Sequence, residues 1–186
     1  MDAKIFSQTM GEISSLWYRS KDFETVRRLL EDLMPKLSSE QQSAVLLFLG
    51  TIKKEQGLES QAIADWLLAF PLSRTGSYVR YNLQCEIGRM YESRGETDEA
   101  KSFYGAAIVT CVSGDQFSAN RALAAFLRLS VDVIEPGCLD MIGKAVRKSW
   151  DVLELPGEPD VNDILQAARD LSLGLEEKIS KIKQRF

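Results

Sequence analysis

The sequence predicts an all-α fold built from consecutive antiparallel helix hairpins, and three observations lead to this prediction. Apolar residues recur at three- and four-residue intervals along most of the 186 residues, which is the period of a helix that buries one face. A layout of helix, tight turn and helix occurs three times in succession. Prolines occur only where helices would end or connect, at Pro35, Pro71, Pro136, Pro156 and Pro159.

Each hairpin consists of two apolar helical stripes separated by a turn. The stripes with their turn residues are Met10–Trp17, Lys21-Asp22 and Val26–Leu33; Ala44–Ile52, Gly57 and Ala62–Phe70; and Val79–Tyr91, Gly95 and Ala100–Ile108. In the third hairpin Thr97 is expected to cap the second helix, with Asp98 and Glu99 at its positive end. The pattern therefore predicts six helices that pair with their neighbours in sequence.

One position in each first helix and one in each second helix align across the three hairpins. They are Ser14, Gly50 and Gly88, and Val26, Ala62 and Ala100, and the members of each set stand 36 and 38 residues apart. Glycine and alanine allow two helices to approach to the closer end of the usual separation of about 8–10 Å. We expect Trp66 and Tyr104 to fill the space beside these small residues.

These positions resemble the tetratricopeptide repeat, a helix-turn-helix unit of about 34 residues. Residues 81–114 match best, through Ile87-Gly88, Tyr91, Gly95, Ala100, Tyr104 and Ala107. Residues 43–76 follow, with Lys53 where the family has an aromatic residue, and residues 7–40 form a degenerate copy. The resemblance implies a right-handed superhelical array that occupies the whole chain, 1–186, as a single domain.

The C-terminal part fits the repeat loosely. Residues 117–153 have the length of a degenerate fourth hairpin, and 160–186 form an apolar-striped helix that Asp160 would cap. Two interpretations of this last helix stay open. It covers the apolar end of the array, or its last turns, past Gly174, project as a dimerisation or partner-binding helix.

Composition and motifs argue against catalysis and against several kinds of ligand. The chain has no histidine, no glycine-rich phosphate loop and no paired cysteine motif, so we expect no enzyme activity, cofactor or metal. Cys85, Cys111 and Cys138 are expected to be reduced and mostly buried. A net charge of -4 gives no reason to expect nucleic acid binding. With no membrane-spanning stretch or signal sequence, a cytoplasmic protein is expected.

The resemblance also implies a concave groove, lined by the first helices, that binds an extended peptide or a helix of a partner protein. Alignment places these residues in it: Tyr18, Arg19, Leu47, Thr51, Lys54, Glu55, Asn82, Cys85, Arg89 and Glu92. Leu47 and Cys85 fit a core role equally well, and the charged residues also fit a solvated helix face. A clamp for a C-terminal carboxylate is not expected, because Glu86 follows Asn82 by one turn.

The sequence therefore predicts a protein-interaction scaffold or adaptor, and its partner is not encoded in any readable motif. Three alternatives stay open: a small acidic secretion chaperone with the same repeats, a regulatory domain that forms a homodimer through its last helix, and a helical-repeat hydrolase. A further hypothesis is that Arg74, Arg80 and Arg121 converge into a contact site if the loop 71–77 folds back.

Overall fold

A computed structural model describes residues 1–114, 119–129 and 144 of the chain. The described residues form helices and contain no strand, which confirms the all-α prediction for them. The chain divides into two compact units, Met1–Arg74 and a second that begins at Thr75. The expectation of a single domain with superhelical curvature stays a prediction, and the expected helix at 160–186 lies outside the described residues.

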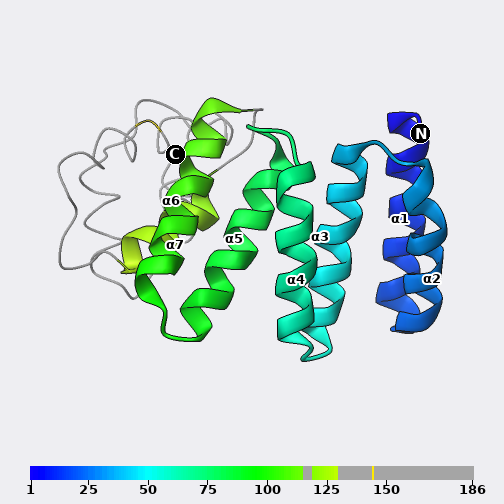
Figure 1. Ribbon diagram of the computed structural model, residues 1–186, viewed down its shortest axis with the longest axis horizontal. Helices are drawn as coiled ribbons and strands as arrows, with labels where there is room; N and C mark the ends of the chain where they lie inside the picture. Colours follow the sequence, from blue (N-terminus) through cyan, green and yellow to red (C-terminus); the bar gives the residue numbers. More distant parts are fainter. Residues whose placement is uncertain (115–118, 130–143, 145–186) are drawn as a thin grey trace, which may run out of the picture. The chain divides into compact units, whose positions relative to one another are not determined.

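The first unit contains two helix pairs, each followed by a short 3₁₀ helix that includes a proline (Figure 1). Its elements are α1 (Ala3–Ser20), α2 (Phe23–Leu33), η1 (Met34–Lys36), α3 (Ser39–Glu55), α4 (Glu59–Ala69) and η2 (Phe70–Leu72). The first backbone N–H groups of a helix have no acceptor within the helix. Proline, which has no N–H, therefore loses no hydrogen bond at the start of a helix. Pro35 and Pro71 therefore end each hairpin, as the sequence indicates.

The second unit contains a third pair, α5 (Tyr78–Ser93) and α6 (Thr97–Ser113), and a further helix, α7 (Asn120–Leu129). Helix α6 packs against both of its neighbours in sequence (Figure 1). One hydrophobic cluster of this unit lies between α6 and α7 and contains Ala100 and Tyr104 of α6 together with Ala125 of α7. Phe126 and Leu129 of α7 also pack there, so α7 covers part of α6.

Each first helix begins three or four residues before the predicted repeat, because a capping residue precedes it. Asp2, Ser38 and Ser77 each accept hydrogen bonds from the first backbone N–H groups of α1, α3 and α5. The prediction that Thr97 caps α6 is wrong. Glu96 takes that position without a side-chain bond, and the Thr97 hydroxyl lies 3.5 Å from the Gly95 carbonyl, to which it donates.

The predicted close approach of helices is confirmed in the second and third hairpins. A Cβ atom added to Gly50 would lie 2.3 Å from Nε1 of Trp66, and one added to Gly88 would lie 3.0 Å from the ring of Tyr104. Both aromatic rings are buried. Gly57 and Gly95 close these two hairpins, both with φ of +76°, a conformation that favours glycine.

Lys53, which stands where the repeat family has an aromatic residue, forms an ion pair instead. Its ammonium group lies 2.7 Å from the Asp65 carboxylate of α4, and both side chains are largely buried. Removing either partner would leave a charge in a poorly solvated place. The pair therefore connects α3 to α4 through a contact that the family pattern does not predict.

The first hairpin is built differently from the other two. Ser14 and Val26 replace the glycine and alanine of the later hairpins, and α1 and α2 pack less closely on each other. Most of their buried surface belongs to a core shared with α3, which includes Trp17, Leu30 and Ile52. Packing on α3 therefore contributes to the stability of this hairpin beside the contact between its own two helices.

We predict that Gly50→Ala lowers the free energy of unfolding by about 1–3 kcal/mol, and that Gly88→Ala costs less. The added methyl group would overlap the Trp66 ring more severely than the Tyr104 ring. Urea denaturation of the purified variants measures both effects. Gly105→Ala is the control, because its Cβ would meet Phe126 at 3.5 Å, an ordinary contact. Equal losses for all three variants would contradict this explanation.

Candidate partner-binding surface

The residues that the sequence places in a groove lie on the first helices α1, α3 and α5, and most of them already have partners within their own unit. Tyr18 and Arg19 lie in the last turn of α1, and both are exposed. The Tyr18 ring is 61% exposed and lies 5.0 Å from the ammonium group of Lys21. No described residue pairs with the Arg19 guanidinium. These two side chains are available to a partner.

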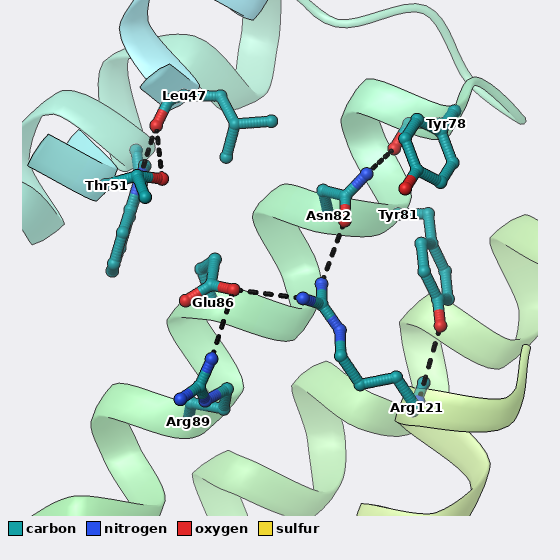
Figure 2. A network of polar contacts seen from close by, with 10 residues as sticks. Leu47, Thr51, Tyr78, Tyr81, Asn82, Glu86, Arg89 and Arg121 are labelled. Carbon is teal, nitrogen blue, oxygen red and sulfur yellow. Dashed lines mark hydrogen bonds and ion pairs between the residues drawn. The ribbon is translucent and has the colours of Figure 1, made fainter. Parts of the chain in front are cut away.

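The four predicted groove residues of α3 differ in how many contacts they form inside the first unit. The Thr51 hydroxyl donates to the Leu47 carbonyl at 2.9 Å, and Nε1 of Trp66 donates to the same oxygen at 3.2 Å (Figure 2 shows the first of these bonds). The Lys54 ammonium lies 5.8 Å from the centre of the Trp66 ring. Leu47 and Thr51 are half-buried, so they help to form the hairpin as well as its surface.

Glu55 connects the first two hairpins of the first unit. Its carboxylate accepts a hydrogen bond from Nε1 of Trp17 at 3.2 Å and forms an ion pair with Lys21 at 2.9 Å. Lys21 also lies over the Trp17 ring, 4.6 Å from its centre. The carboxylate therefore has an internal role, and a partner that binds it competes with these contacts.

In the second unit, Arg121 of α7 reaches across to α5 (Figure 2). Its guanidinium donates to the Glu86 carboxylate at 3.1 Å and to the Asn82 side-chain oxygen at 2.9 Å. Arg89 donates to the same Glu86 oxygen at 3.4 Å. We call this group the α5–α7 clasp: Asn82, Glu86 and Arg121. It satisfies Glu86, whose side chain is only 11% exposed.

The far end of α5 has a second polar connection to α6 and α7. The Glu92 carboxylate accepts a hydrogen bond from the Tyr104 hydroxyl at 2.8 Å and forms an ion pair with Arg128. Burial, together with the bond to Glu92, raises the pKa of Tyr104. Glu92 therefore orders three helices, although the sequence singles it out as a residue that would touch a partner.

Cys85 lies in the core rather than in a groove. It is completely buried, and burial raises the pKa of its thiol. The neighbouring Tyr81 is also buried, and its hydroxyl accepts a hydrogen bond from the backbone N–H of Ala122. Of the two interpretations that the sequence allows for Cys85, the core role is the one that this structure supports.

Arg89 remains as the exposed cation of α5. Half of its side chain, 52%, is exposed, and its bond to Glu86 is long. The structure thus separates the predicted set by how strongly each residue is held internally. Tyr18 and Arg19 are exposed, and Arg89 is held only by its long bond to Glu86. In contrast, Glu55, Asn82 and Glu92 form internal polar contacts, and Cys85 lies in the core.

The role of Arg121 is the feature that sequence analysis missed. The hypothesis grouped it with Arg74 and Arg80, whereas the structure commits its guanidinium to Glu86 and Asn82. One signal was present in the sequence: Glu86 stands between apolar residues in the middle of α5. An acid in such a place needs a cation, but only the fold could identify which one.

Comparisons with protein-family models, curated proteins and solved structures find no match to this chain. Among the described residues, no helix has both the length and the apolar character needed to cross a membrane. Within the same residues, no three Cys, Asp or Glu side chains gather in a way that could hold a metal ion. What the chain does must therefore be inferred from its own geometry.

We predict that Arg121→Ala lowers the free energy of unfolding by about 1–3 kcal/mol, because the largely buried Glu86 loses its shorter hydrogen bond. The double variant Glu86→Gln/Arg121→Gln should lose less than the sum of its single variants. Arg94→Ala, an exposed residue at the end of α5, is the control and should change stability little. Additive losses would show that Glu86 and Arg121 do not act together.

We predict that Cys85 and Cys111 do not react with a thiol reagent in the native protein, because both are buried. Labelling followed by peptide mass spectrometry identifies which cysteines are modified. The same chain in urea is the control, and there both residues should react fully. Rapid native labelling of Cys85 would contradict the core position assigned to it.

Proposed function

We propose that this chain is a scaffold of the tetratricopeptide type that binds a segment of a partner protein on the exposed faces of its first helices. The observation that carries the proposal is the glycine–aromatic joint, which occurs once in each unit at the same place in the hairpin. Gly50 faces Trp66, and Gly88 faces Tyr104. Such a joint fixes the angle between two helices and leaves their outer faces available for contact with a partner.

The internal bonds support a binding role because they hold the helices rigid before any partner arrives. The clasp formed by Asn82, Glu86 and Arg121 ties α7 to α5, and Glu55 ties α1 to α3. A preorganised surface loses little conformational entropy on binding, so more of the contact energy appears as affinity. The buried free thiols Cys85 and Cys111 fit a reducing, cytosolic setting.

The proposed contacts are cations and one aromatic ring on the first helices, taken in each unit separately. In the second unit this is the exposed Arg89. In the first unit they are the exposed Tyr18 and Arg19, together with the half-buried Lys54. Guanidinium and ammonium groups suit a partner segment with carboxylates, and Tyr18 offers an apolar face. The proposed ligand is therefore an acidic peptide segment with apolar side chains.

We predict that Arg89→Glu and Lys54→Glu each weaken capture of such a partner by about tenfold, since each replaces an attractive charge with a repulsive one. The experiment is affinity capture from the native cell, followed by titration of the captured protein against each purified variant. Arg28→Glu on α2 is the matched control, because Arg28 is exposed and lies on a second helix.

Circular dichroism on the same samples excludes a loss of folding as the cause of weaker capture. If every captured protein binds both variants as tightly as the original chain, the first-helix surface is not the binding site. If Arg28→Glu weakens binding equally, the effect is one of net charge and the assignment to α3 and α5 is wrong.

A further inference from the structure

A groove of about 360 Å³ lies between α1 and α2 in the first unit. Its floor consists of the apolar side chains Ile13 and Leu16 of α1 and Leu29 and Leu33 of α2. Leu29 is 38% exposed, so part of this apolar floor is open to solvent. This hairpin has no counterpart of the glycine–aromatic joints at Gly50 and Gly88, since Ser14 and Val26 stand at the matching positions.

The two walls of the groove each present a carboxylate that has no cation. Glu12 of α1 accepts one hydrogen bond, from the neutral amide of Gln8 at 3.1 Å. Asp32 of α2 has no hydrogen bond or ion pair with any described residue. In contrast, Glu31, its neighbour in sequence, pairs with Arg27 at 2.6 Å. The groove is therefore apolar in its floor, with a carboxylate on each side and Lys36 at one end.

The spacing of the groove residues fits a helix as the occupant. On α1 they stand at positions 9, 12, 13 and 16, which is the i, i+3, i+4, i+7 pattern of one helix face. On α2 they stand at 29, 32 and 33, again on one face, and Lys36 follows in η1. Two such faces side by side form the seat for a third helix, in the way that amphipathic helices bind to grooves. Lys36 marks one end of the seat with a positive charge.

We propose that this groove is a docking site for an amphipathic helix of a partner protein that carries arginine or lysine on both sides of an apolar stripe. The apolar stripe covers Leu16, Leu29 and their neighbours, and the basic side chains pair with Glu12 and Asp32. The site adds a second surface to the proposed scaffold role. It rests on that role only in requiring a protein partner, since it shares no residue with the first-helix contacts.

A helix-stapled peptide of about four turns provides the test. It carries leucines at i, i+3, i+4 and i+7 with arginines beside them, and a second peptide has glutamates in place of the arginines. Fluorescence anisotropy should give a Kd on the order of 10–100 µM for the arginine peptide and no binding for the glutamate peptide. Amide shifts in the NMR spectrum should be confined to α1 and α2.

Charge reversal on the walls distinguishes this site from unspecific binding. Asp32→Lys and Glu12→Lys should each weaken the arginine peptide by about tenfold. Glu31→Lys is the matched control, because it makes the same charge change one residue away on α2, outside the groove lining, and it should leave Kd unchanged. Both reversals affect exposed residues, so folding should be retained.

Four results would overturn the proposal. They are an absence of binding by the arginine peptide, equal binding by the glutamate peptide, an unchanged Kd for Asp32→Lys, and a dimer in sedimentation that Leu29→Gln dissociates, which would show that a second copy fills the groove. The first-helix site is tested separately. A captured partner that is lost with Arg89→Glu but kept with Asp32→Lys leaves the proposed function standing.

Discussion

The close approach of a glycine to an aromatic ring at the crossing of two helices is the constraint on which the second and third hairpins depend. At Gly50 and Gly88 the missing Cβ leaves room for Trp66 and Tyr104, whose rings then fill the core of their hairpins. Because a packed interior tolerates little change in volume, this contact fixes both the separation of the helices and their rotation. All other contacts of the hairpin are arranged around it.

In the second unit, the contact of Gly88 with Tyr104 fixes α5 against α6, and polar side chains elsewhere on α5 form hydrogen bonds with α6 and α7. Tyr104 illustrates this, because the ring that packs on Gly88 also places its hydroxyl against Glu92. Farther along α5, Glu86 and Asn82 hold Arg121 of α7. A carboxylate that is largely buried in this way contributes order more than stability, since its desolvation offsets much of the attraction. Helix α5 thus connects its partner α6 to the next helix in the chain.

The hairpins and their joints could be predicted because the signals are local. Helical periodicity, the turn glycines and the repeated small residues each act within about 35 residues of sequence. The binding residues were harder to predict. Glu92 and Asn82 have the polarity of surface groups, and only the position of Arg128 and Arg121 in space shows that they are engaged. Thr97 was predicted to cap α6, but the helix begins at Thr97 and Glu96 is its N-cap residue. The backbone conformation of the turn decides this position, and the residue types alone do not specify it.

The sequence by itself determined that the described chain is helical, where its hairpins turn and which glycines meet which rings. It could do so because these features follow from backbone preference and side-chain volume over short stretches. Only the tertiary structure decided which charges are free. Asp32 and Glu86 are both helix carboxylates, yet Asp32 lines an apolar groove, whereas Glu86 is bound by Arg121, 35 residues away in the sequence. The energy of a charge depends on what surrounds it in space, and neighbours in sequence do not specify those surroundings.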